Sequence, residues 1–153
     1  MRHGKYITIA GFVIIVTAFV GWWLSRLPRA QLVDQTTANL GWVLQDYIRA
    51  RGVMPTGMAE LEKAGFVFRT SDGLYSTTTS PHVLYYLECI NIAWGRDLAT
   101  LEVRRGELRD TKSGQICYII KRKGWWLAST FGSIEGDMQT SIRVFEAFSA
   151  RSK

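Results

Sequence analysis

Reactive and metal-binding side chains are scarce in this chain of 153 residues. It has two cysteines and two histidines, and the cysteines form no CxxC pair or other spacing typical of a metal site. Its thirteen acidic residues are scattered, so neither a paired-carboxylate site nor an EF-hand loop is indicated. No G-x-S-x-G, P-loop or dinucleotide fingerprint is present. The sequence therefore predicts no catalytic residue, no metal and no cofactor, and it does not favour an enzyme.

The two cysteines leave two interpretations open. Cys89 and Cys117 lie 28 positions apart, each within a strand-like apolar run. Outside the cytoplasm they would be a candidate disulfide, whereas inside it they would be small buried core residues. A reactive thiol–imidazole pair of Cys89 with His82 is excluded on an extended strand, because seven residues at about 3.3 Å each separate them by more than roughly 20 Å.

A strong excess of one charge is also absent, since the net charge is +6. The basic clusters Arg104-Arg105 and Lys121-Arg122-Lys123 lie at predicted hairpin turns. Neither belongs to a basic helix or is interleaved with aromatic residues, so nucleic acid is not an expected partner. We interpret both clusters as solvated turns, with contact to anionic lipid headgroups as the alternative.

Charged residues are missing altogether from Tyr6 to Leu24, a run of 19 residues. As a helix this run is about 28 Å long, close to the roughly 30 Å hydrocarbon core of a bilayer. Tyr6 at one end and Trp22 and Trp23 at the other are aromatic residues of the kind found at membrane interfaces. The sequence therefore predicts a tail and a single transmembrane helix within residues 1–25, with the lipid bilayer as a partner.

Two further features bear on this anchor. A cleaved signal peptide needs small residues after its apolar core, and Trp22-Trp23 occupy that place, which favours a retained helix. Two Lys or Arg residues lie near each end of the run, and the free amino terminus tips the balance toward a cytoplasmic N-terminus. Residues 26–153 are then expected to form a soluble domain outside the cytoplasm.

The rest of the chain has the periodicity of an α+β domain. Apolar residues from Ala30 to Arg51 recur at spacings of three and four, which predicts an amphipathic helix that ends at Gly52. Thr56 is the expected N-cap of a short helix over 57–64, and residues 137–150 carry a second amphipathic pattern. The charged residues of the first helix are expected to face away from the core: Asp34, Asp46 and Arg49.

Strand-like runs lie between these helices. A small hairpin or an ordered loop is predicted around residues 71–73, a long strand over 83–94, and further hairpins around Gly106 and Gly124. The long strand is apolar on both faces, so both need cover. We therefore predict an antiparallel sheet of about four strands, packed against the amphipathic helix and accompanied by a C-terminal helix.

Glu88 is the exception on the long strand, because it shares a face with apolar side chains. A buried carboxylate requires a cationic partner. If Glu88 is buried, Arg104 and Arg122, on neighbouring predicted strands, are its candidate partners in an ion pair. The alternative is an exposed glutamate at the edge of the strand.

The pattern resembles that of type IV pilins and type II secretion pseudopilins. The likeness rests on Gly11-Phe12-Val13-Ile14-Ile15, similar to the processing site of the family, and on a Gly-x-x-Pro-Thr-x-x-x-x-Leu-x-x-x-Gly run. The residues of that run are Gly52, Pro55, Thr56, Leu61 and Gly65. Val16 stands where the family typically has a glutamate. The resemblance implies a long N-terminal helix packed on an antiparallel sheet, with assembly through the apolar helix.

We therefore expect a bitopic protein of the bacterial inner membrane whose periplasmic domain acts by protein–protein assembly. It would be a pilin-like or pseudopilin-like component or accessory of a secretion or pilus-type machine, with other membrane or pilin-like subunits as partners. The alternative function is a membrane-tethered ligand-sensing or regulatory domain. That alternative requires a concave pocket lined by aromatic residues of the sheet over 83–130.

Overall fold

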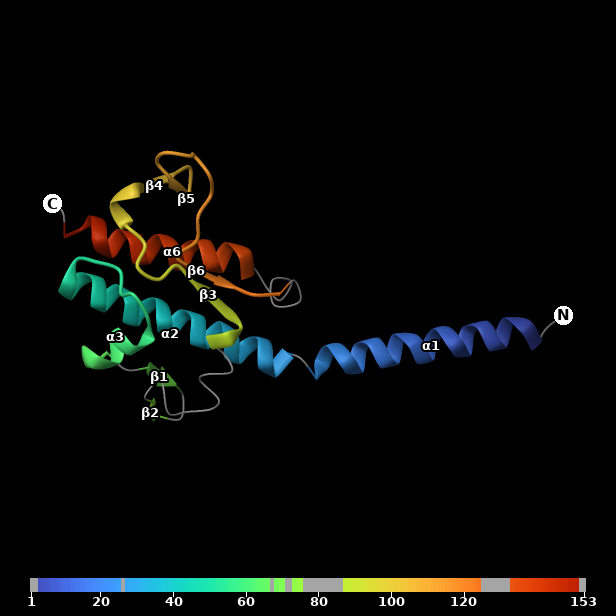
Figure 1. The fold of residues 1–153 in the computed structure, drawn as a ribbon. Coiled ribbons are helices and arrows are strands. Elements are labelled where there is room, and N and C mark those ends of the chain that lie inside the picture. Colours follow the sequence, from blue (N-terminus) through green and yellow to red (C-terminus); the bar gives the residue numbers. More distant parts are fainter. Residues whose placement is uncertain are drawn as a thin grey trace. The chain divides into compact units, whose positions relative to one another are not determined.

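The computed structural model describes the backbone of residues 3–25, 27–66, 68–70, 73–75, 87–124 and 133–151. Within these ranges the chain is α+β, as expected (Figure 1). Its helices are α1 (His3–Leu24), α2 (Leu27–Arg51), α3 (Met58–Lys63) and α6 (Ser133–Ser149), with a 3-10 turn η1 (Leu98–Thr100). The chain divides into two compact units, residues 1–31 and 32–153. This boundary lies inside α2, six residues beyond the predicted one after residue 25.

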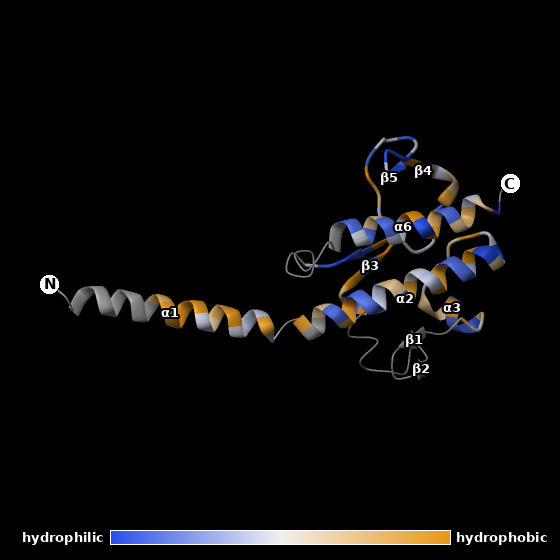
Figure 2. Ribbon diagram, turned by 180° about the vertical axis from the view of Figure 1, so that it is seen from behind, coloured by the Kyte–Doolittle hydropathy of each residue, from blue (hydrophilic) through white to orange (hydrophobic). Residues whose placement is uncertain are grey.

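α1 is one continuous helix over the uncharged run. Its side chains from Phe12 to Leu24 are all exposed, and Figure 2 shows this segment as largely hydrophobic. The Thr17 hydroxyl donates to the Val13 carbonyl at 2.8 Å, so its polar group is satisfied within the helix. Among the residues that the structure describes, none of the helices combines the length and the hydropathy that a membrane span requires.

α2 is amphipathic, as its sequence pattern predicts. Leu40, Leu44 and Ile48 are fully buried, whereas Trp42 on the opposite side is 61% exposed. Gly52 ends the helix: it has a φ of 76° and donates its N–H to the Ile48 carbonyl at 2.7 Å. A positive φ is readily adopted by glycine, which is why the sequence located this end correctly.

α3 lies where the short helix over 57–64 was predicted, but it begins at Met58. Gly57 is its N-cap and makes no side-chain capping bond, so the prediction that Thr56 caps the helix is wrong. Thr56 precedes the cap and bonds to Glu60 instead. At the other end the Phe66 N–H donates to the Leu61 carbonyl at 2.9 Å, and Gly65 has a φ of 80°. This arrangement is a Schellman C-cap.

The described strands form three antiparallel pairs instead of one four-stranded sheet. The pairs are β1 (Phe68–Thr70) with β2 (Gly73–Tyr75), β3 (Ile90–Ile92) with β6 (Ile120–Arg122), and β4 (Leu101–Arg104) with β5 (Glu107–Asp110). The prediction of one sheet fails because the segment over 116–122 pairs with two different strands. Ile116 forms a bridge with Arg109 of β5, whereas residues 120–122 pair with β3.

The hairpins predicted around residues 71–73 and around Gly106 are confirmed by β1–β2 and β4–β5. The long strand predicted over 83–94 is shorter than expected, since residues 87–88 are helical and the strand covers Ile90–Ile92. Its first residues, 83–86, lie outside the described ranges. The same holds for 125–130, the expected second strand around Gly124.

α6 packs on the strands and lies beside α2 in the unit over 32–153 (Figure 1). The Ser141 hydroxyl, fully buried, accepts the N–H groups of Ile119 and Ile120 at 3.0 and 3.2 Å. α2 and α6 run in the same direction. Their early turns meet at Arg122, which contacts both Asp34 and Asp137, and their ends meet where Arg151 donates to the Arg49 carbonyl.

Candidate functional site

The largest run of exposed apolar side chains that the structure describes lies on α1. Phe12, Ile14 and Ile15 are 68%, 68% and 69% exposed. Consecutive helical residues point about 100° apart, so an unbroken apolar run from Phe12 to Val16 covers the whole circumference of the helix. Such a surface is not the one-sided stripe of a helix that packs on a soluble core.

Trp22 and Trp23 end this surface, at the place where the sequence predicted an interface. The Phe19 ring stacks on Trp22 with centroids 5.9 Å apart and lies 6.3 Å from Trp23. The side chain of Tyr6, the predicted aromatic residue at the other end, lies outside the described residues. The structure thus places Trp22 and Trp23, which lie at one end of the uncharged run, on the helix surface.

In the unit over 32–153, Arg122 of β6 is the centre of an ion cluster with α2 and α6. Its Nε donates to Asp137 Oδ1 at 2.8 Å, and its backbone N–H donates to Asp137 Oδ2 at 3.0 Å. Its Nη1 donates to Asp34 Oδ1. The side chains of Arg122 and Asp137 are each 6% exposed and that of Asp34 is 41% exposed. Burial raises the pKa of Asp137, and the hydrogen bonds from Arg122 oppose this rise.

This cluster bears on two predictions. The candidate buried pair of Glu88 with Arg104 or Arg122 is not formed: Arg122 is buried, but its carboxylate partners come from the two helices, while Glu88 and Arg104 are exposed. The alternative of an exposed Glu88 is the one that the structure shows. Asp34, expected to face away from the core, turns toward Arg122. A hollow of about 230 Å³ opens beside the cluster. Its lining is Asp34, Thr37, Ala38, Arg122, Gly136, Asp137 and Thr140.

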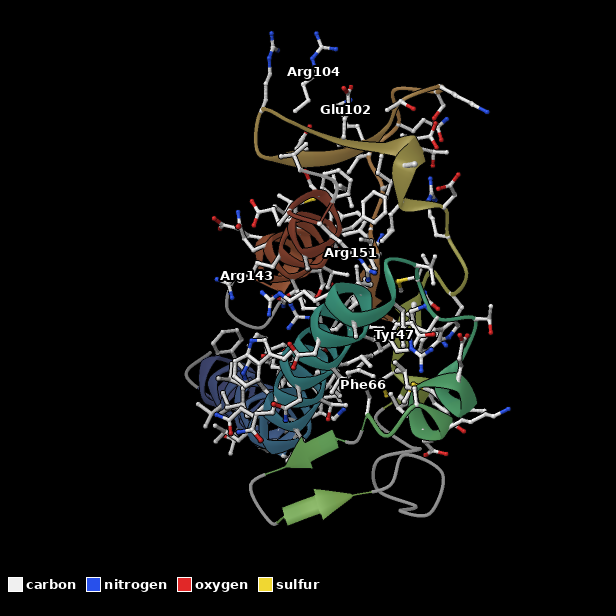
Figure 3. The ribbon with its side chains drawn as sticks, turned by 90° about the vertical axis from the view of Figure 1, so that its left-hand side faces the viewer. Tyr47, Phe66, Glu102, Arg104, Arg143 and Arg151 are labelled. Atoms are coloured by element: carbon white, nitrogen blue, oxygen red, sulfur yellow. The ribbon has the colours of Figure 1, made fainter. Side chains whose placement is uncertain are left out.

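A second polar network fastens α3 to α2. The Tyr47 hydroxyl donates to Glu60 Oε1, and the Thr56 hydroxyl and N–H both donate to Glu60 Oε2 at 2.7 Å. These bonds, led by that from the Thr56 N–H, lower the pKa of Glu60 to about 2. The Tyr47 ring also contacts Phe66 edge-on, with centroids 5.4 Å apart (Figure 3). Sequence reasoning missed this network, although Thr56 followed four residues later by Glu60 at a helix start was an available signal.

Cys89 and Cys117 are both free thiols in the structure. The Cys89 carbonyl accepts the N–H of Lys123, which places Cys89 beside the end of β6. Cys117 lies six residues earlier, where its N–H donates to the Leu108 carbonyl and its sulfur contacts Arg96 Nη2 at 3.4 Å. The candidate disulfide is therefore not formed, because the register holds the two residues at different ends of the strand segment.

The ion cluster at Arg122 and the network at Glu60 hold helices and strands of the chain together. No group of three or more His, Cys, Asp and Glu residues that could hold a metal ion occurs in the ranges described. His82 and the Trp125-Trp126 pair lie outside those ranges. No protein-family model matches the chain, and no curated protein or solved structure matches it either.

Proposed function

We propose that this chain is a bitopic protein of the bacterial inner membrane that acts by protein–protein assembly, as a pilin-like or pseudopilin-like component or accessory of a secretion or pilus-type machine. The observation that carries the proposal is the apolar, exposed circumference of α1. Exposed apolar surface is unfavourable in water at about 25 cal/mol per Å². Lipid chains and apolar helices of neighbouring subunits would both cover it.

The N-terminal part of α1 also supports this proposal. Phe12–Leu24 alone is too short to cross a bilayer, but the uncharged run begins at Tyr6 and reaches 19 residues. α1 is helical from His3 onward, so the whole run lies within one helix. A length of about 28 Å then matches the hydrocarbon core.

The residues of the pilin-like motif have coherent roles in the fold. Gly52 ends α2, Gly65 ends α3, and Leu61 is fully buried between them. The spacing of the motif thus corresponds to the connection of the amphipathic helix to the short helix and then to the strands. This order of elements supports the resemblance as a guide to function.

The ligand-sensing alternative requires a pocket lined by aromatic residues. Within the described residues, the hollow at Arg122 and the hollow at the β4–β5 hairpin are lined by polar, charged and small residues. Neither lining includes an aromatic side chain, so neither hollow favours that function.

The anchor is tested by placing a charge at the centre of the run. Ile15→Arg would cost about 2.5–3.5 kcal/mol at the middle of a membrane helix. In cells that express the full chain, we expect the wild type to stay in membranes through an alkaline carbonate wash and I15R to be released. Leu32→Arg, at an exposed position of α2, is the matched control and should stay bound. Release of the wild type would contradict the proposal.

Assembly is tested separately by cysteine cross-linking in native membranes. In a C89S/C117S background, single cysteines at Ile14 and Phe19 should give covalent dimers on oxidation, because α1 is the proposed contact between subunits. A cysteine at exposed Thr111 is the control for random collision. Cross-linking at α1 no stronger than at Thr111 would refute assembly through this helix while leaving the anchor intact.

A further inference from the structure

The β4–β5 hairpin ends in a tip that carries two exposed arginines. Arg104 is the last residue of β4, and Arg105-Gly106 forms the two-residue turn before Glu107. Figure 3 shows the Arg104 side chain pointing away from the strands at the end of the hairpin. Because a two-residue turn brings no further chain over the tip, both guanidinium groups face outward.

Glu107, one of the carboxylates near this tip, is already engaged. The register places Glu107 opposite Arg104, yet Glu107 Oε2 accepts from Arg109 Nε at 3.1 Å. Arg109 is held further by a bond from its Nη1 to the Gly114 carbonyl at 2.7 Å. Within the ranges that the structure describes, the side chains of Arg104 and Arg105 make no ion pair. The tip thus presents two adjacent cations that make no ion pair, with the Glu102 carboxylate on the same hollow.

The backbone at Arg105 is unusual for an arginine. Its φ is 55° and that of Gly106 is 78°, values that correspond to a type I′ turn, in which Asn, Asp or Gly is favoured at the first position. Among the residues that the structure describes, the Arg105 side chain has no hydrogen-bond or ion-pair partner, and its backbone has a φ of 55°, which is unfavourable for arginine. An unfavourable conformation of this kind points to a role in binding.

The surroundings of the tip suggest the chemistry of the partner. A hollow of about 280 Å³ lies between Glu102, Arg104, Arg105, Arg109 and Gly114. Ile116, which bridges to Arg109 of this hairpin, is apolar and 45% exposed. Exposed cations beside an exposed apolar side chain are typical of surfaces that lie in a membrane interface.

We propose that this tip binds the phosphodiester group of an acidic phospholipid. The guanidinium groups of Arg104 and Arg105 donate to the phosphate oxygens, which their planar fork fits, and Ile116 contacts the apolar side of the interface. This apolar neighbour favours a lipid over an acidic peptide. The inference rests on the membrane location proposed above and adds a lipid class and a binding site to it.

The experiment uses the full chain in neutral detergent micelles. Short-chain phosphatidylglycerol, short-chain phosphatidylcholine and inorganic phosphate are titrated separately, and the amide resonances of Arg105 and Gly106 are followed by NMR. We expect saturable shifts with phosphatidylglycerol and much weaker ones with the other two. Each arginine near an anionic lipid surface contributes about 1 kcal/mol, or about fivefold in affinity, so R104Q/R105N should bind roughly 25-fold more weakly. Asn is favoured in this turn, so the variant keeps the hairpin.

The matched control is K123Q/R143Q, which removes two exposed positive charges elsewhere (Arg143 is labelled in Figure 3). It should retain wild-type affinity. An equal loss in this control, equal binding of phosphate alone, or no shift with phosphatidylglycerol would each overturn the proposal. None of these results affects the alkaline wash or the α1 cross-linking, so failure here is separable from failure of the proposed function.

Discussion

Gly41 shows how one missing side chain sets the approach of two helices. A Cβ added at this position of α2 would lie 2.5 Å from Thr140 Cγ2 of α6. That separation is far below van der Waals contact, so α2 and α6 could keep their spacing only if Thr140 moved. The Thr140 hydroxyl is bonded to the Gly136 carbonyl at 2.8 Å, which opposes rotation of its side chain.

We expect Gly41→Ala to destabilise the unit over 32–153. Overpacking costs about 1–3 kcal/mol, whereas the helix propensity of alanine returns about 1 kcal/mol, so the net loss is about 0–2 kcal/mol. Thr140→Ser removes the clashing methyl group, and G41A/T140S should therefore be more stable than G41A. Denaturant midpoints of the full chain in detergent measure both. A double variant no more stable than G41A would refute the steric explanation.

Glu60 predicts a dependence of stability on pH. Its pKa is lowered to about 2 by bonds that exist in the folded chain, and in the unfolded chain it returns to its ordinary value of about 4.3. Its contribution to stability is complete above the unfolded value and is lost as pH falls from about 4.3 toward 2.

Glu60→Gln should remove this part of the acid sensitivity. We expect the midpoint of the wild type to fall between pH 5 and pH 2.5 by more than that of E60Q. The control is Glu146→Gln, at an exposed position of α6, which should keep the wild-type slope. Equal slopes for the wild type and E60Q would show that the network at Glu60 does not carry the effect.

At the scale of elements, the ion cluster at Arg122 determines how α2, β6 and α6 fit together. Asp137 binds both the guanidinium and the backbone N–H of Arg122, and their side chains are 6% exposed. Asp34 reaches the same guanidinium from a position that is 41% exposed. Solvent screens the Asp34–Arg122 ion pair more than the Asp137–Arg122 ion pair. The two pairs therefore contribute unequally to the free energy of unfolding.

Asp137→Asn and Asp34→Asn should therefore lower the free energy of unfolding by different amounts. Removing one partner of a buried pair costs about 3–5 kcal/mol, whereas a partly exposed pair contributes about 1 kcal/mol or less. We expect D137N to lower the free energy of unfolding by the larger amount and D34N by the smaller one. Chemical denaturation monitored by circular dichroism measures both. Similar losses would contradict the assignment of the buried contact as the stronger one.

At the scale of the whole molecule, the proposed function depends on whether residues 1–11 are cleaved from the chain. The resemblance to pilins implies cleavage after Gly11, but Val16 stands where that family has a glutamate and apolar residues already precede Gly11. We expect the chain extracted from membranes to keep its full mass of 17.4 kDa. Intact-mass spectrometry checks this, and a mass that begins at Phe12 would favour a processed fibre subunit over a retained accessory.

The sequence by itself determined the presence of the helices, the C-terminal ends of α2 and α3, and the hairpins around residues 71–73 and Gly106. These features depend on periodicity and on glycines that adopt positive φ, both local properties of the chain. It also determined the uncharged run that forms most of α1.

Only the tertiary structure decided the partners of Arg122 and the division of the strands. Asp34 and Asp137 lie 88 and 15 residues from Arg122 along the chain, and no local pattern indicates that α2 and α6 place them on either side of it. The segment over 116–122 likewise looks like one strand, yet it pairs with β5 and then with β3. Such contacts depend on how the helices pack, and packing is set by the combined burial of many distant side chains.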